Sequence, residues 1–169
     1  MNDLTLYNAV RDQMLNDTGG CIEWHSNKPL GAAIQSFSHS YLNHASLLIP
    51  MRGRKEPRIF ITEALADGVV PNFLSVSLAQ YDGEAYWYPL KDEWEPKRND
   101  IEDRAFSYLG VPYDYENLFK NAVEHTDIRT EKLFCSEYVW VCYGFTTGPA
   151  PRPGELAQKG IFKDPVRIL

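Results

Sequence analysis

The spacing of apolar residues divides the chain into a first part that favours strands and a second part that favours helices. A helix is predicted over residues 4–14, where Leu4, Tyr7, Val10 and Met14 recur at helical spacing. Short runs rich in apolar and β-branched residues follow it. They predict strands at residues 21–24, 44–49, 58–64, 69–70, 74–78 and 85–90.

Helical spacing returns after a polar connection at residues 93–100. Helices are expected over residues 101–109, 115–123 and 134–145, with a weaker one at 30–37 and a helical turn at 154–158. Because the strands precede most of the helices and do not alternate with them, the pattern favours an α+β fold.

Composition narrows the class of protein. A chain of 169 residues with 44% hydrophobic residues fits a single domain, 1–169, with a sizeable core. The net charge of −6 and the lack of a long basic run argue against nucleic-acid binding. Neither a signal peptide nor a run of about 20 apolar residues is present, so we expect no membrane span and a cytoplasmic protein, unless it belongs to a phage particle or is released by lysis.

The three cysteines form no pattern typical of disulfides, which favours free thiols. Cys135 opens the best predicted helix, where unpaired amides and the helix dipole favour a thiolate and can receive a developing oxyanion. The alternative is that Cys135 is a small buried hydrophobic residue. Cys142 lies two turns later on the same apolar face and is expected to be an inert core thiol.

A nucleophilic thiol needs a base, and His44 is the best candidate because it begins an apolar strand. His25, His39 and His125 are expected at the surface or in supporting positions. Glu63 ends the next strand. If the two strands are antiparallel neighbours, its carboxylate could orient the imidazole. A solvated carboxylate is the alternative for Glu63, and Asp67 is the reserve candidate.

Other chemistry has little support. The sequence contains no CxxC pair, and His39 and His44 are not at helical spacing, so no metal site is expected. Gly19-Gly20 is an isolated pair without a phosphate-loop context, and no cofactor is expected.

Five segments in the same order resemble the permuted NlpC/P60 (papain-like) cysteine hydrolases of the YiiX/YaeF-like branch. The segments are Gly20–Trp24, Ser40–Ala45, Glu63-Ala64 with Gly68-Val69, Gly110–Tyr113 with Cys135-Ser136, and Pro153–Ala157. The resemblance implies Cys135 as nucleophile, His44 as base, Glu63 as third member and Tyr113 as support for the oxyanion. We further expect Trp24 and Tyr138 to contact substrate. Cys21 replaces the family's usual aspartate, and the segment between Tyr113 and Cys135 is longer than usual.

The resulting hypothesis is a small antiparallel sheet or open barrel packed against the helix that carries Cys135. The protein would cleave an amide or ester through a thioester acyl-enzyme. The resemblance implies small peptides, amino-acid amides, cell-wall fragments such as peptidoglycan peptides, or lipid acyl groups as substrates. Two alternatives stay open: a catalytically silent binding domain on this fold, and an acyltransferase of the lecithin retinol acyltransferase type.

Overall fold

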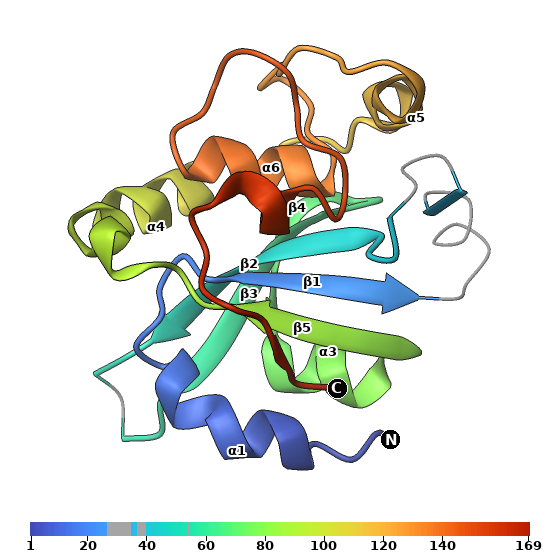
Figure 1. The fold of residues 1–169 in the computed structure, drawn as a ribbon. Helices are drawn as coiled ribbons and strands as arrows, with labels where there is room; N and C mark the ends of the chain where they lie inside the picture. Colours follow the sequence, from blue (N-terminus) through green and yellow to red (C-terminus); the bar gives the residue numbers. More distant parts are fainter. Residues whose placement is uncertain (27–34, 37–39, 54) are drawn as a thin grey trace.

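The computed structural model describes residues 1–26, 35–36, 40–53 and 55–169 (Figure 1). The predicted helix over residues 30–37 therefore lies outside the described residues, except at 35 and 36. The strands are β1 (Cys21–Ser26), β2 (His44–Met51), β3 (Arg58–Leu65), β4 (Gly68–Phe73), β5 (Gly83–Tyr88) and β6 (Val166–Arg167). The helices are α1 (Thr5–Met14), α3 (Leu74–Gln80), α4 (Arg98–Ser107), α5 (Tyr115–Val123) and α6 (Cys135–Cys142), with 3₁₀ turns η1 (Asp92–Lys97) and η2 (Leu156–Lys159).

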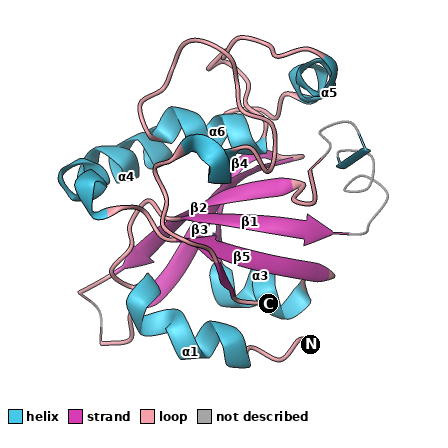
Figure 2. Ribbon diagram, in the orientation of Figure 1, coloured by secondary structure: helices cyan, strands magenta, loops and turns pink. Residues whose placement is uncertain are grey.

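The strands form one antiparallel sheet in the order β4-β3-β2-β1-β5-β6. The α+β class and the antiparallel sheet packed against α6 are therefore confirmed. The sheet lies between two helical layers, with α1 and α3 on one face and α4 and α6 on the other (Figure 2). Within the described residues, no helix is both long enough and apolar enough to span a lipid bilayer.

Strand β1 is buried along its whole length because both faces of the sheet are covered. Successive side chains of a strand point to opposite faces. Cys21 accordingly joins the core under α4 and α6, whereas Ile22 and Trp24 join the core over α1 and α3. The same alternation in β2 and β3 decides which side chains reach the candidate site.

The strand predicted over residues 74–78 is wrong. Leu74, Val76 and Leu78 alternate like a strand, but this segment forms α3. Leu74 and Leu78 are four residues apart and both fully buried, while Val76 is 49% exposed. Helical spacing of the two leucines therefore decided the structure, because it places both on one face of a short helix.

Helix boundaries also differ from the prediction, most at the start of α4 and at the end of α6. The polar connection contains η1, and α4 begins at Arg98, three residues before the predicted start. Helix α6 ends at Cys142 and not at residue 145, because Gly144 adopts a φ of 96° that stops the helix.

An ion pair between Asp17 and Arg98 ties three parts of the fold together inside the protein. Asp17 Oδ1 accepts from Arg98 Nη1 at 2.8 Å and from the Leu90 backbone N–H at 3.2 Å. Its other oxygen accepts from Trp87 Nε1 at 2.7 Å. Gly20 follows closely, and a Cβ there would lie 2.0 Å from Asp17 Oδ2. The carboxylate therefore links the turn before β1 to β5 and to the start of α4.

Glu23 carries a carboxyl group into the core at the centre of β1. It is fully buried, and neither oxygen forms a hydrogen bond of good geometry within the described residues. Burial raises the pKa of Glu23 to about 8, although the Ala157 backbone N–H offsets part of the effect. The ordinary pKa of a glutamate is 4.5. Between pH 4.5 and about pH 8, Glu23 is therefore protonated in the folded state and ionised in the unfolded state.

We therefore expect the free energy of unfolding to fall as pH rises from about 4.5 to about 8, with Glu23 contributing at most about 1.4 kcal/mol per pH unit. Glu23→Gln should flatten this slope, since the amide stays neutral. Urea denaturation across the window measures it. Glu56→Gln, at an exposed glutamate, is the matched control. An unchanged slope in Glu23→Gln would contradict the assignment of a protonated core carboxyl.

Candidate active site

Cys135 is the first residue of α6, and the segment before it is braced. Phe134 adopts an extended backbone at the N-cap. The Glu137 side chain accepts hydrogen bonds from the Phe134 N–H at 3.4 Å and from the Arg129 N–H at 3.1 Å. Burial raises the pKa of Glu137 to about 7, and these two N–H donors oppose that rise. The Glu137 side chain of α6 therefore fixes the backbone at Phe134, immediately before Cys135.

His44 begins β2 and lies against both Glu63 and Cys135. Its Nε2 is 2.7 Å from Glu63 Oε2. Burial alone would lower the pKa of His44, but the contacts with the Cys135 thiol and the Glu63 carboxylate outweigh it and raise the pKa to about 10. Because Glu63 occupies Nε2, the ring nitrogen left to exchange a proton with the thiol is Nδ1.

Asn72 was not identified from the sequence, yet it holds the second oxygen of Glu63. Asn72 Nδ2 donates to Glu63 Oε1 at 2.9 Å. In the β3–β4 register Glu63 pairs with Val70 and Ile61 pairs with Asn72, so Glu63 and Asn72 are diagonal neighbours on one face. Asn72 could have been identified from the sequence only if the pairing of β3 with β4 had already been known. Asp67, the reserve candidate, lies exposed in the turn between β3 and β4.

Tyr113 approaches Cys135 from the other side. The segment around Tyr113 pairs with Leu133, two residues before the cysteine. Burial raises the pKa of Tyr113 well above its ordinary value, and the charge and hydrogen bonding of the Cys135 side chain raise it further. The Cys135 backbone N–H also faces the phenol oxygen. The structure thus brings Cys135, His44, Glu63 and Tyr113 together.

A pocket of about 330 Å³ opens beside the histidine and its carboxylate partner. Trp24, His44 and Glu63 line it, together with α3 and the residue that follows, Tyr81. Cys135 itself is only 1% exposed and does not line this pocket. From this pocket, a reactant therefore meets His44 before it meets the sulfur.

Tyr138 lies in the core and not on a substrate surface, contrary to the expectation from the sequence. It is fully buried, and its hydroxyl donates to Thr62 Oγ1 at 2.7 Å. Cys142 and Cys21 are buried as well. Burial raises the pKa of Cys142 to about 12 and that of Cys21 well above its ordinary value.

The other histidines lie apart from Cys135. His25 stacks on Tyr41 with ring centroids 3.8 Å apart, and the side chain of His125 is 45% exposed beside Glu155. His39 falls outside the described residues. Within the part of the chain that the structure describes, no three acidic, histidine or cysteine side chains converge as they would around a metal ion.

The order of the elements along the chain identifies the class of protein. Papain-like hydrolases join a cysteine at a helix start to a histidine on the packed sheet. Here the sheet with His44 precedes the helix with Cys135, so the fold is a permuted form of that class. Residues 18–167 match the family described as the permuted papain-like amidase enzyme, YaeF/YiiX, C92 family, and the chain belongs to this family. It is a cysteine hydrolase of the amidase type. No curated protein matches the chain.

Proposed function

We propose that Cys135 is the nucleophile and His44 the general base of an amide hydrolysis that proceeds through a thioester. His44 Nδ1 takes the thiol proton, and the thiolate attacks the carbonyl carbon. The C–N bond breaks, and the imidazolium returns the proton to the leaving amine. Water, deprotonated by His44, then attacks the thioester and releases a carboxylic acid, which regenerates the thiol.

The contact chain from Asn72 through Glu63 and His44 to Cys135 is the observation that carries this proposal. Glu63 holds Nε2 and stabilises the imidazolium, and Asn72 holds Glu63. Both are positioning residues. The Cys135 backbone N–H, with the Tyr113 hydroxyl beside it, is the donor pair that we assign to the oxyanion.

The pocket beside His44 supports a substrate with a neutral, largely apolar acyl group. Apart from His44 and Glu63, the described residues that line it carry no charge, and apolar or aromatic side chains contribute much of its wall: Trp24, Leu65, Val76 and Tyr81. Leu65 and Val76 are 36% and 49% exposed, so the apolar surface continues to the rim. We propose peptide-like amides with an apolar acyl group as the substrate class, with Trp24 as one of the contacting residues.

Alkylation by iodoacetamide tests the activated thiol. We expect selective modification of Cys135 at about pH 7, because the neighbouring His44 imidazole can take up the thiol proton and leave a nucleophilic sulfur. Mass spectrometry of peptides measures it, and Cys21 and Cys142 serve as internal controls in the same chain. In His44→Ala the selectivity should be lost, while Glu63→Gln should slow the reaction less.

Modification of Cys135 as slow as that of Cys142 would overturn the proposal and favour a silent binding domain. The test also addresses access, since the sulfur is 1% exposed. Product analysis with a competing amine separates hydrolysis from acyl transfer: a carboxylic acid product supports the hydrolase, whereas an acylated amine as the main product contradicts it.

A further inference from the structure

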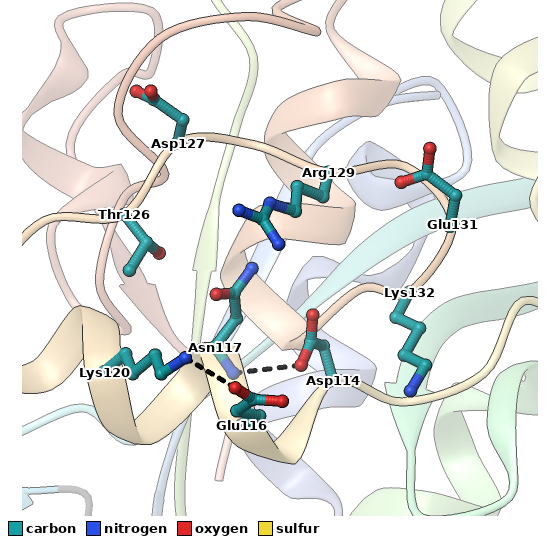
Figure 3. Close-up of a pocket in the computed structure, with 9 residues that line it drawn as sticks. All are labelled: Asp114, Glu116, Asn117, Lys120, Thr126, Asp127, Arg129, Glu131 and Lys132. Atoms are coloured by element: carbon teal, nitrogen blue, oxygen red, sulfur yellow. Dashed lines mark hydrogen bonds and ion pairs between the residues drawn. The ribbon is translucent and has the colours of Figure 1, made fainter.

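A second cavity, of about 400 Å³, lies between α5 and the segment that leads to α6 (Figure 3). None of the residues proposed for catalysis lines it. Its walls are polar and charged, in contrast to the largely apolar pocket beside His44. The volume is in the range of sites that hold small ligands.

The cavity borders the back of the candidate active site. The Asp114 N–H donates to Leu133 O at 3.3 Å, and Leu133 N–H donates to Pro112 O at 3.0 Å. In extended backbone, neighbouring side chains point to opposite sides. Tyr113 accordingly contacts Cys135, while Asp114 lines the cavity. One short segment thus separates the two sites.

Two buried polar atoms in the cavity wall have no hydrogen-bond partner within the described residues: Asn117 Nδ2 and Thr126 Oγ1. Asn117 is only 8% exposed. Figure 3 shows its amide group pointing from α5 toward Arg129 on the facing segment. A buried amide without a partner is costly, so its presence in a cavity wall indicates a ligand that accepts its hydrogen bond.

Charged side chains of both signs surround these atoms, and Arg129 and Lys132 act electrostatically on Glu116. Asp114 accepts from the Asn117 backbone N–H at 2.9 Å, and Glu116 pairs with Lys120. Four further side chains form no hydrogen bond or ion pair with any described residue, and they comprise two cations and two anions: Arg129, Lys132, Asp127 and Glu131. An ion of one sign would be repelled by half of this set, whereas a molecule with both charges matches it.

The cavity is held in shape before any ligand arrives. Asn121 Oδ1 accepts from the Thr126 N–H at 2.9 Å, and Thr126 O accepts from the Ala150 N–H at 2.8 Å. The Arg129 N–H is held by Glu137 of α6. These bonds use the backbone of the segment and leave the side chains of Thr126 and Arg129 for a ligand. Preorganisation of this kind reduces the entropy lost on binding.

We propose that this cavity binds a small zwitterion of the α-amino-acid class, separately from the thiol. Its carboxylate accepts from Asn117 Nδ2, Thr126 Oγ1 and the Arg129 guanidinium, and its ammonium group lies toward Asp127 and Glu131. This inference does not depend on the roles proposed for Cys135 and His44.

Titration of ¹⁵N-labelled protein with L-alanine, followed by NMR, tests the site. We expect saturable shifts at Asn117 and Thr126 in the wild type and equally in Cys135→Ala. Arg129→Gln and Asp127→Asn should each weaken binding about tenfold or more, the loss expected for one charged hydrogen bond. Asn117→Leu should do the same, and Arg129 and Asp127, both exposed, remain informative if Asn117→Leu fails to fold. Arg58→Gln, at an exposed arginine of β3, is the matched control and should bind like the wild type.

Acetate, methylammonium and inorganic phosphate are the comparison ligands. Each should bind at least tenfold more weakly than L-alanine, because each satisfies only one sign of charge. Binding of acetate or phosphate as tight as that of L-alanine would overturn the zwitterion, and so would the absence of saturable shifts in the wild type. Loss of binding in Cys135→Ala would overturn the separation from the thiol.

Discussion

Cys135→Ala is expected to reduce the turnover of amide substrates by roughly 10⁴-fold or more, because no other group at the site can form the thioester. The fold should survive, since alanine removes one sulfur atom from a braced helix start. Release of a fluorescent amine from N-acyl amides measures the rate. His44→Ala should cost about as much, because a nucleophile and its general base, the roles proposed for Cys135 and His44, act as a unit.

Substitutions at Glu63 and Cys142 provide the comparison for this result. Glu63→Gln should lower turnover by roughly 10²- to 10³-fold. This loss is smaller than that expected for the proposed nucleophile or base, because the role proposed for Glu63 is to orient His44. Cys142→Ala is the matched control for the nucleophile: it removes a buried thiol from the same helix and should leave turnover unchanged. Turnover in Cys135→Ala at the rate of Cys142→Ala would remove Cys135 from the mechanism.

Asp17→Ala should lower the free energy of unfolding by about 3–5 kcal/mol, the cost of breaking a buried ion pair from one side. The substitution leaves the Trp87 indole N–H and the Leu90 N–H without their acceptor. It also removes the buried carboxylate opposite Arg98, which keeps only Glu95 and the Thr18 carbonyl as acceptors. For a chain of this size the melting temperature should fall by roughly 10 °C. Urea denaturation and thermal unfolding measure the two quantities.

Asp12→Ala is the matched control for this effect. The Asp12 side chain is 98% exposed and lies 3.9 Å from Arg11, an arrangement worth little in water. Asp17→Asn keeps the shape of the side chain but loses the charge opposite Arg98, and should fall between the wild type and Asp17→Ala. An equal free energy of unfolding in Asp17→Ala and Asp12→Ala would show that the contacts of Asp17 with Arg98 and Trp87 do not stabilise the fold.

Local sequence carried much of the information about the candidate site. A cysteine at the start of a helix and a histidine at the start of an apolar strand are both visible in one dimension, because helix starts and apolar runs depend on neighbouring residues. Glu63 was predictable only on the condition that β2 and β3 pair as antiparallel neighbours, and they do. Five family-like segments in the right order supplied the topology that periodicity alone leaves open.

Other features depend on contacts between residues far apart in the chain. Leu74 to Leu78 reads as a strand by alternation, but burial of both leucines against the sheet made it a helix. Tyr138 shares its helix with Cys135, and only the packing of α6 on β3 shows that its hydroxyl is bound by Thr62. Asn72 could not be predicted from the sequence either, because its hydrogen bond to Glu63 depends on the pairing of β3 with β4.

The sequence by itself therefore determined the α+β class, the permuted order of histidine and cysteine, and most of the helices. Tertiary structure alone decided that Asn72 supports Glu63 and that Tyr138 belongs to the core. It also decided that Asp17 is a buried carboxylate paired with Arg98, whereas both oxygens of the buried Glu23 carboxyl lack a hydrogen-bond partner within the described residues. The physical reason is the range of the interactions. Periodicity and helix-end chemistry act over a few residues, whereas strand register, burial and hydrogen bonding of side chains depend on segments that meet only in the folded protein.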